Sequence, residues 1–361
     1  MKPFNLETTC GKARAGTLVT AHGEIKTPFF MPVATKGSVK LLSNEEVVSL
    51  GTQCLISNAF VLSLEPGLLA IDAAKGLHRF MGWDRPLFTD SGGFQVLSPV
   101  FNKGLTEKGV FFRNPFDGKK DLFTPEKSME IQNRLGSDVA MCLDDVPTAG
   151  SSKERLAESA KRTTEWAKRC INAHENKKQL LFGICQGGND KKLREKSARE
   201  IVGLGFDGHA VGGLSIGESK KEMFEMAEIS LGFFPEEKPR YLMGVGSVKE
   251  LVQAICLGVD VFDSAFPTRT ARHGMAFGID GNLNIESPKF ARDFRPLDKD
   301  CECFVCKSHS RAFVHHLVKT KEENGLKYLS YHNLFFVQNV MKEMRTQIIE
   351  GTFSAEKFFG K

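Results

Sequence analysis

The sequence predicts an α/β protein built as a (β/α)8 TIM barrel with a C-terminal subdomain, and three observations support this fold class. Eight short apolar runs lack polar alternation, which is typical of strands buried on both faces of a parallel sheet. Segments with helical periodicity separate most of these runs. Glycines and polar residues follow most of them, as expected where the strands of one barrel converge on an active site.

Length and composition set the limits of this prediction. The chain has 361 residues and 41% hydrophobic content, and we expect one domain over residues 1–361 with an insertion at 290–335 before the last helix. A doubly wound open sheet is the alternative that strand counting does not exclude. No apolar run reaches the length of a membrane span and no signal peptide is visible, so we expect a cytoplasmic protein. The net charge of +5 permits an anionic partner without requiring one.

The expected strands lie at residues 29–31, 54–56, 87–88, 139–143, 180–184, 209–211, 241–243 and 259–262. Helices are expected at 43–51, 124–136, 153–171, 191–202, 219–231 and 247–258, and a C-terminal apolar stripe runs from Leu334 to Ile348. Capping boxes open three of these helices, at Ser43/Glu46, Ser219/Glu222 and Ser247/Glu250. Residues 96–123 do not fit the alternation and are expected to form a hairpin insertion.

Seven of the expected strands end in residues that carry chemistry or turn sharply: Asn58, Asp90-Ser91-Gly92-Gly93, Asp144-Asp145, Gln186-Gly187-Gly188, Gly212-Gly213, Gly244-Val245-Gly246 and Asp263. Ordinary turn chemistry explains one such end. At this many ends of one barrel, a site at its C-terminal face is the better explanation.

Three of these residues, Asp90, Asp144 and Asp263, are carboxylates on different strands. Paired carboxylates serve glycosyl transfer, in which one attacks the anomeric carbon and the other moves protons. The alternative is that some of them cap helices or pair with Arg269 or Arg272, and we prefer such a structural role for Asp145.

A flat base is a suitable ligand for the same strand ends. The carboxylate of Asp144 accepts two N–H donors from a guanine edge, while the amide of Gln186 and the backbone N–H of Gly213 donate to its carbonyl. Met243 and Phe94 are candidates to enclose the ring, although residues of these types are more often part of the core.

Three cysteines cluster as Cys301-x-Cys303-x-x-Cys306, which is metal-ligand spacing and predicts one structural zinc ion. A tetrahedral site needs a fourth ligand, for which the candidates are His309, His315, His316 and His332. Two arginines of the segment 268–273, which follows Asp263, either clamp phosphates or belong to a solvated loop.

From about Ala13 to its end, the chain resembles the tRNA-guanine transglycosylases, also called queuine tRNA-ribosyltransferases, and within them the bacterial-type catalytic subunit. The motifs that carry the resemblance are Thr89-Asp90-Ser91-Gly92-Gly93-Phe94-Gln95, Cys185-Gln186-Gly187-Gly188, Ala210-Val211-Gly212-Gly213-Leu214, Arg240-Tyr241-Leu242-Met243-Gly244-Val245-Gly246, Phe262-Asp263 with Pro267-Thr268-Arg269, and the cysteine cluster with His332. The resemblance implies a TIM barrel with a C-terminal zinc subdomain.

The resemblance also implies a reaction, in which guanine at the wobble position of tRNAs with a GUN anticodon is exchanged for a 7-deazaguanine in queuosine biosynthesis. Asp263 matches the nucleophile that links covalently to the ribose, and Asp90 matches the general acid/base. The implied base-binding residues are Asp90, Ser91, Gly92, Gly93, Phe94, Asp144, Gln186, Gly213, Leu214 and Met243. The implied tRNA-binding residues are Gly244, Val245, Gly246, Ser247, Val248, Lys249, Glu250, Thr268, Arg269, Thr270, Ala271 and Arg272.

The resemblance further implies that Cys301, Cys303, Cys306 and His332 hold the zinc ion and that the protein is a homodimer, with His309, Phe313 and His316 near the zinc site. Ile216, beside the expected position of the 7-substituent, leaves little room, so we expect preQ1, the small aminomethyl base, to be preferred over queuine or the cyano base preQ0. Phe94 and Val146 match the eukaryotic enzymes instead. A non-catalytic tRNA-binding accessory subunit and a barrel glycosidase acting on a free sugar are the competing functions.

Overall fold

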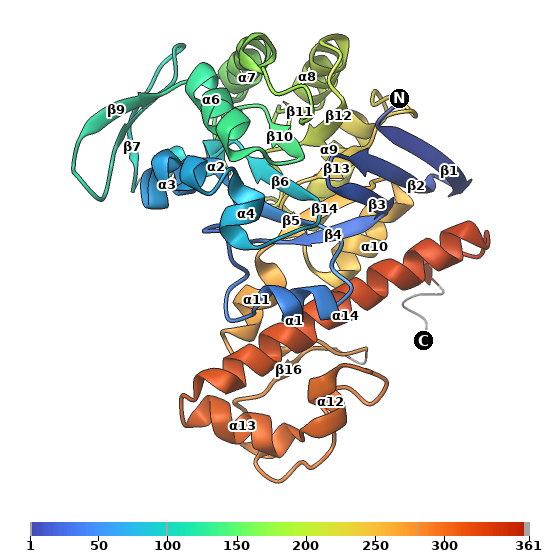
Figure 1. The fold of residues 1–361 in the computed structure, drawn as a ribbon. Coiled ribbons are helices and arrows are strands. Elements are labelled where there is room, and N and C mark those ends of the chain that lie inside the picture. Colours follow the sequence, from blue (N-terminus) through green and yellow to red (C-terminus); the bar gives the residue numbers. More distant parts are fainter. Residues whose placement is uncertain (1, 99, 280, 357–361) are drawn as a thin grey trace.

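The computed structural model describes residues 2–98, 100–279 and 281–356. Its centre is one sheet of eight parallel strands (Figure 1), in hydrogen-bonded order β4 (Phe29–Pro32), β14 (Val261–Ser264), β13 (Arg240–Leu242), β12 (Gly208–Val211), β11 (Leu180–Cys185), β10 (Val139–Met141), β6 (Leu87–Asp90) and β5 (Leu55–Asn58). A parallel bridge between Val33 and Ile56 brings the two edges together. The sheet is therefore a nearly closed barrel, which confirms the predicted fold class over an open sheet.

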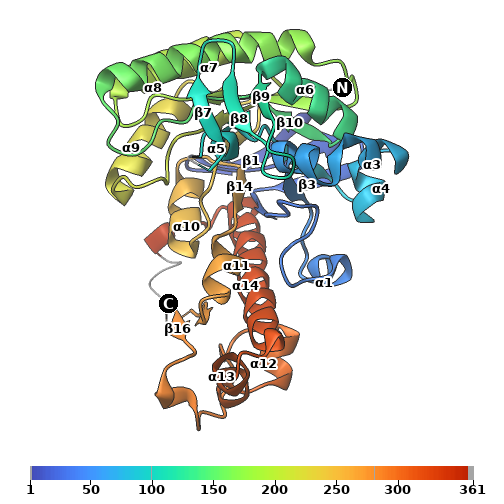
Figure 2. The same ribbon diagram turned by 90° about the vertical axis from the view of Figure 1, so that its left-hand side faces the viewer.

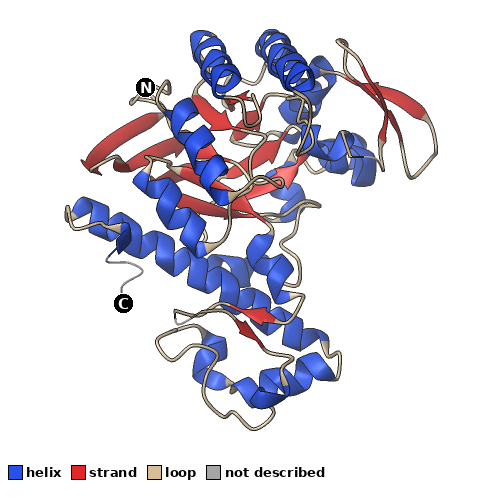
Figure 3. Ribbon diagram, turned by 180° about the vertical axis from the view of Figure 1, so that it is seen from behind, coloured by secondary structure: helices blue, strands red, loops and turns tan. Residues whose placement is uncertain are grey.

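Aromatic rings fill the interior of the barrel. The ring of Phe88 meets those of Phe182 and Tyr241 edge to face, with centroids 5.6 Å and 6.3 Å apart, and all three side chains are fully buried. The predicted helices pack outside the strands (Figure 3), and they are α1 (Asn44–Ser49), α6 (Pro125–Leu135), α7 (Lys153–Ala173), α8 (Lys191–Gly203), α9 (Lys220–Leu231) and α10 (Val248–Cys256).

Two of the three predicted capping boxes are present, at Ser43 and Ser219. At the third, the Ser247 side chain accepts from the N–H of Glu250, but the reciprocal bond is absent. The carboxylate of Glu250 lies instead 2.6 Å from the ammonium of Lys220, the first residue of α9. A charged partner on a neighbouring helix therefore outcompetes the local N–H.

An antiparallel sheet that the sequence did not predict, of β1 (Phe4–Cys10), β2 (Ala13–Thr20) and β3 (Gly23–Thr27), covers the N-terminal end of the barrel. Arg14 of β2 pairs there with Asp260, which precedes β14, at 3.2 Å, and both side chains are buried. Short helical segments that were also not predicted are α2 (Ala59–Leu62), the π-turn Ser63–Gly67, α3 (Leu68–Ala73), α4 (Leu77–Met81), α5 (Gly93–Val96) and α11 (Phe266–Ala271).

The insertion after β6 is a three-stranded antiparallel sheet of β7 (Asn102–Leu105), β8 (Val110–Arg113) and β9 (Lys120–Phe123), so the expectation of a hairpin was wrong by one strand. The third strand forms because Val110 and Phe123 pair and bury both side chains. The sheet projects from the barrel in Figures 1 and 3. Trp166 of α7 holds its tip through a 2.8 Å bond to the carbonyl of Glu107.

The C-terminal part contains β15 (Met275–Ala276), β16 (Leu283–Asn284), a 3-10 turn (Pro288–Phe290), α12 (Phe304–Ser308), α13 (Arg311–Lys319) and α14 (Glu323–Ile349). Figure 2 shows α14 running from this subdomain to the barrel. The helix α14 begins at Glu323, earlier than the apolar stripe from Leu334 to Ile348 indicates, because the buried Leu329 extends this stripe toward the N-terminus. None of the helices within the described residues is long and apolar enough to cross a membrane.

Candidate active site

The C-terminal ends of the barrel strands bring the predicted carboxylates together. Asp90 ends β6, and its two oxygens accept hydrogen bonds from the Asn58 amide at 2.9 and 3.1 Å. The backbone N–H of Gly92 donates to the same carboxylate at 2.9 Å. Gly92 has a φ of 82°, and a Cβ there would lie 2.2 Å from the Cβ of Phe60, so this turn requires glycine.

The environment of Asp90 raises the pKa of its carboxyl group to about 7, chiefly through burial and additionally through the negative charges of Asp263 and Asp144. The hydrogen bonds from Gly92 and Asn58 act in the opposite direction. A carboxyl group with a pKa near neutrality exchanges protons in both directions at physiological pH, which suits a general acid/base.

Asp263 lies on β14, one of the strands that face Asp90 across the barrel mouth. Its Oδ1 accepts a hydrogen bond of 2.6 Å from the Tyr241 hydroxyl and one of 2.9 Å from the Gly244 N–H. Burial raises the pKa of Asp263, while these two donors lower it. Oδ2 has no hydrogen bond to any residue that the structure describes. One oxygen is thus held in place and the other is left free for chemistry.

The predicted base-reading residues also lie together. The Gln186 amide nitrogen donates to Oδ2 of Asp144 at 2.6 Å, and the amide oxygen of this fully buried side chain has no partner among the described residues. Burial raises the pKa of Asp144 to about 7, and the negative charge of Asp145 adds to this. Gly213 packs directly on Gln186, where a Cβ would lie 2.1 Å from the amide oxygen.

The loop after β6 reaches this group as well. A Cβ at Gly93 would lie 2.9 Å from Oδ1 of Asp144, so the second glycine of the pair allows the loop to approach the carboxylate. Ser91 is buried, and its hydroxyl accepts from the N–H of Gly93. Phe94, at the next position, is 60% exposed and therefore does not belong to the core. Met243 is half-buried and packs against the core cluster, as does the buried Leu214.

Asp145 has the structural role that we preferred for it, although its partners differ from Arg269 and Arg272. Its Oδ2 lies 2.8 Å from Arg155 and 2.6 Å from Arg162, both of α7. Asp145 is completely buried. This ion pair leaves Asp144 as the carboxylate of the pair that faces the site.

Two segments carry positive charge beside the barrel mouth. Residues 244–250 follow β13 and include the first turn of α10, and residues 268–272 lie in and just after α11. Lys249 lines a cavity of about 280 Å³, together with Ser247, Val248 and Phe266. Within the described residues, neither Arg269 nor Arg272 forms an ion pair, and burial lowers the pKa of Arg272. These charges suit an anionic partner.

The cysteine cluster has the geometry of a tetrahedral metal site. The sulfurs of Cys301, Cys303 and Cys306 lie 3.6, 3.5 and 3.4 Å from Nδ1 of His332. Zinc–sulfur and zinc–nitrogen bonds at a tetrahedral angle give a separation of about 3.6 Å. Nε2 of His332 lies 2.8 Å from the carbonyl of Phe277, which orients the ring with the Nδ1 lone pair toward the sulfurs. The cluster is therefore able to hold a metal ion.

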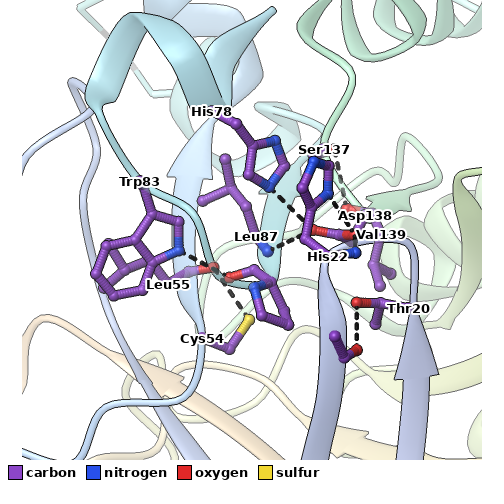
Figure 4. Close-up of polar contacts among 12 residues, drawn as sticks. Thr20, His22, Cys54, Leu55, His78, Trp83, Leu87, Ser137, Asp138 and Val139 are labelled. Carbon is purple, nitrogen blue, oxygen red and sulfur yellow. Dashed lines mark hydrogen bonds and ion pairs between the residues drawn. The ribbon is translucent and has the colours of Figure 1, made fainter. Parts of the chain in front are cut away.

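A second group of metal-ligating side chains, His22, His78 and Asp138, lies at the N-terminal end of the barrel (Figure 4). Asp138 accepts from His22 Nδ1 at 2.9 Å and from His78 Nε2 at 3.0 Å, and also from the backbone N–H groups of His22 and Leu87 at 2.9 Å each. The imidazole rings stack with centroids 3.7 Å apart. Four donors thus occupy the carboxylate of Asp138, which indicates a structural role. We call His22, His78 and Asp138 the Asp138 staple, because they link separate segments of the chain by hydrogen bonds.

Two residues of the site had no assigned role in the sequence-based prediction. Asn58 appeared only as a polar residue at a strand end, and Tyr241 only as an apolar residue within a strand. The strand-end position was a usable signal for Asn58. The sequence contains no comparable signal for Tyr241, because its hydroxyl meets Asp263 only through the pairing of β13 with the neighbouring strand β14.

Comparison with known proteins shows to which family the chain belongs. A family model described as "Queuine tRNA-ribosyltransferase" matches residues 9–358. Three relatives named queuine tRNA-ribosyltransferase are similar to this chain along most of their length. The relative from Pelotomaculum thermopropionicum is 48% identical to it over 94% of this chain and 92% of the relative. The relatives from Fusobacterium nucleatum and Bacillus subtilis are 46% and 45% identical, over 98% and 96% of this chain and 96% and 92% of the relatives. The chain therefore belongs to the queuine tRNA-ribosyltransferase family.

Proposed function

We propose that this protein is a tRNA-guanine transglycosylase that replaces guanine at the wobble position of tRNAs with a GUN anticodon by a 7-deazaguanine. The observation that supports this most is the arrangement of two carboxylates, Asp90 and Asp263, beside a separate carboxylate–amide pair, Asp144 and Gln186, at one barrel mouth. A glycosidase acting on a free sugar would have no use for the second pair. The names of the relatives point to the same reaction.

The proposed chemistry proceeds in two displacements at the ribose C1′. Oδ2 of Asp263 attacks C1′, the glycosidic bond to guanine breaks, and Asp90 donates a proton to the departing base. Asp90, now ionised, takes a proton from the incoming 7-deazaguanine. That base attacks C1′ and releases Asp263 as a carboxylate. Two inversions at one carbon retain the β configuration, as in retaining glycosidases.

Base recognition follows from the donors and acceptors at the strand ends. Asp144 accepts from two N–H groups of the guanine edge, and Gln186 together with the Gly213 N–H donates to its carbonyl. The exposed Phe94 and the half-buried Met243 enclose the ring plane. The main chain of the pocket wall is proposed to come from Ser91, Gly92, Gly93 and Leu214.

The segments 244–250 and 268–272 are proposed to bind the anticodon loop, with Lys249, Arg269 and Arg272 meeting its phosphates. Arginine and lysine side chains beside a site contribute affinity that is independent of sequence and falls with salt concentration. The unpaired charge on α11 supports this assignment.

An exchange assay tests the proposal. Purified protein is incubated with labelled guanine and either a tRNA with a GUN anticodon or the same tRNA carrying adenine in place of the wobble guanine. Incorporation into the first tRNA alone is the expected result. Binding of tRNA without incorporation would indicate an accessory subunit instead, and release of guanine from free nucleoside would indicate a glycosidase.

The proposed incoming base is preQ1. A cavity of about 130 Å³ next to Gly213 is lined by Ile216, Glu218 and Glu222, among others, so it is small and bordered by carboxylates. A small cationic aminomethyl group fits these properties better than the uncharged cyano group of preQ0 or the bulky cyclopentenediol of queuine. Competition among the three bases in the exchange assay checks this choice, and preQ1 is expected to have the highest kcat/KM.

The metal in the Cys301, Cys303, Cys306 and His332 site is proposed to be one structural Zn²⁺ per chain. The three thiolates and the imidazole would supply all four ligands of a tetrahedral ion, which would leave no open position for substrate. Its contribution is to link the loop that carries the cysteines to α14.

A homodimer is proposed from an aromatic patch beside the zinc site. The ring of His309 stacks on Tyr328 with centroids 4.7 Å apart and lies 5.1 Å from the ring of Phe313. Phe304 and Phe313 are 38% and 41% exposed. Exposed aromatic and histidine side chains are typical of interfaces. Sedimentation analysis checks the proposal, and a monomer at micromolar concentration would contradict it.

A further inference from the structure

Arg194 of α8 is a fully buried arginine whose guanidinium does not meet a carboxylate. No acidic side chain within the described residues lies at ion-pair distance from it. Its nitrogens donate to backbone carbonyls instead: Nε to Gly188 at 2.8 Å, Nη1 to Gly212 at 2.7 Å and Nη2 to Gly213 at 3.2 Å, with Cys185 more distant at 3.5 Å. Burying a cation without a carboxylate partner is unfavourable. We therefore expect a role for Arg194 in the backbone that its guanidinium contacts.

All four carbonyls lie at or just after the ends of the two strands, β11 and β12, that carry the base-reading residues. Cys185 and Gly188 flank Gln186 at the end of β11, while Gly212 and Gly213 follow β12. The same face of α8 carries Ser197, whose hydroxyl accepts from the N–H of Gln186 at 3.0 Å. The helix approaches closely because Gly187 has no side chain, and a Cβ there would lie 2.7 Å from the backbone nitrogen of Arg194.

The direction of a peptide carbonyl fixes the direction of the next N–H. In a trans peptide the two groups point opposite ways, so the carbonyls of Gly212 and Gly213 turned toward Arg194 direct the N–H groups of Gly213 and Leu214 away from it. Neither N–H has a hydrogen-bond partner among the residues that the structure describes. Gly213 and Leu214 line the 130 Å³ cavity, and the left-handed φ of 64° at Gly213 maintains this turn.

We infer that Arg194 is a positioning residue that directs the Gly213 amide toward the carbonyl oxygen of the bound base. The inference rests on the proposed function, since it assigns an acceptor to that N–H. Arginine suits this role because its planar guanidinium presents five donors and spans both loops at once. Lysine is a single point charge and cannot fix two successive carbonyls in the same way.

The experiment compares two bases that differ only at the carbonyl. Guanine and 6-thioguanine share the N1–H and 2-amino groups, while sulfur is a far weaker hydrogen-bond acceptor than oxygen. Competitive inhibition constants for both are measured with wild type, Arg194→Lys, Arg194→Met and the control Ile201→Val. Ile201 is buried on the same helix, and its side chain lies beside Gly183, within β11.

Wild type is expected to prefer guanine. In both Arg194 variants the affinity for guanine should fall about tenfold or more, while that for 6-thioguanine changes less than threefold, so the preference shrinks. The KM for the incoming base should rise more than kcat falls, and Ile201→Val should keep the wild-type preference.

Equal weakening of both bases, or an unchanged preference, would overturn the inference. Unfolding of both Arg194 variants at the assay temperature, seen by thermal melting, would also overturn it and assign Arg194 to the fold. If the wild-type protein itself shows no affinity for guanine, the proposed function fails rather than this assignment.

Discussion

Asp90 lies between influences that act on its pKa in opposite directions. Burial and the charges of Asp263 and Asp144 raise it to about 7, and hydrogen bonds from Gly92 and Asn58 restrain the rise. Asn58→Ala removes two of these bonds, at 2.9 and 3.1 Å. Hydrogen bonds to a charged group are worth about 1.5–3 kcal/mol, and about 1.4 kcal/mol corresponds to one pKa unit.

We therefore expect the limb of the kcat/KM–pH profile that reports Asp90 to move upward by at least about one pH unit in Asn58→Ala. The sign follows because loss of donors to the carboxylate favours its protonated form. Ser57→Ala is the matched control, since the Ser57 hydroxyl contacts the sulfur of Met81 and not Asp90. A limb that stays in place in Asn58→Ala would show that Asn58 does not tune Asp90.

Ile216 lines the same cavity as Gly213 and is proposed to limit which 7-substituent fits there. Overpacking typically costs about 1–3 kcal/mol, which corresponds to roughly 10- to 100-fold in kcat/KM. Ile216→Gly is expected to raise kcat/KM for queuine by about that factor and to change the value for preQ1 little. If wild type already uses both bases equally, or if glycine brings no gain with queuine, the steric argument is wrong.

Residue types and strand ends were enough to predict which side chains of the site lie together, because parallel strands of a barrel deliver their C-terminal ends to one face. The same reasoning missed the tuning groups. Tyr241 donates a hydrogen bond to one oxygen of Asp263, and Asn58 donates to both oxygens of Asp90. Such pairing depends on the stagger of adjacent strands, which periodicity does not encode.

At the scale of elements, Asp138 joins three of them: the turn between β2 and β3, the helix α4 and the start of β6 (Figure 4). Burial acts to raise the pKa of Asp138, but hydrogen bonds from His78 and His22 outweigh it, and the net pKa is lowered. Asp138→Asn removes the charge that all four donors share. We expect a loss of about 3 kcal/mol in the free energy of unfolding at pH 7.

The pH dependence of this loss follows from the sign of the shift. A carboxyl group with a depressed folded-state pKa stabilises the protein above its unfolded pKa of about 3.9, and the contribution disappears as the pH falls through the folded value. Urea unfolding from pH 7 down to pH 3 should show the gap between wild type and Asp138→Asn narrowing below about pH 4. A gap that is constant with pH would contradict the charge-based role.

The cysteine cluster links a second pair of elements, since its three sulfurs contact His332 of α14. Cys303→Ser removes a buried cysteine of the proposed zinc site. Since metal binding and folding are coupled at such sites, we expect loss of stoichiometric zinc and of amide-exchange protection in residues 301–332. Cys256→Ser, outside the cluster, should retain both. Elemental analysis with hydrogen exchange decides this, and a stable Cys303→Ser protein with full zinc content would refute the structural role.

Elements with a strong local signal were predicted with nearly correct bounds, such as α6 between Thr124 and Gly136, with proline at its first position. The sheet β1–β3 was missed because its strands share no common pattern: β1 alternates between more and less buried residues, whereas β2 is buried along most of its length. Their stability comes from contacts such as Arg14 with Asp260, which are distant in sequence.

In the whole molecule, the proposed catalytic residues and the stabilising contacts lie at opposite ends of the barrel. The C-terminal face of the barrel carries the carboxylates, the N-terminal face is closed by β1–β3 and the Asp138 staple, and α14 joins the metal subdomain to the barrel (Figures 1 and 2). The central claim concerns one atom of this assembly, the free Oδ2 of Asp263, which is proposed to form a bond to the ribose.

The most direct test is to look for that bond. Protein and a labelled anticodon stem-loop RNA with a GUN anticodon are mixed, quenched with denaturant and resolved on a denaturing gel, and the adduct is mapped by mass spectrometry. Wild type and the surface variant Asp84→Asn should yield an RNA–protein adduct on Asp263, while Asp263→Asn should yield none and lose guanine exchange by orders of magnitude. An adduct in Asp263→Asn, or exchange at even a tenth of the wild-type rate, would contradict the account.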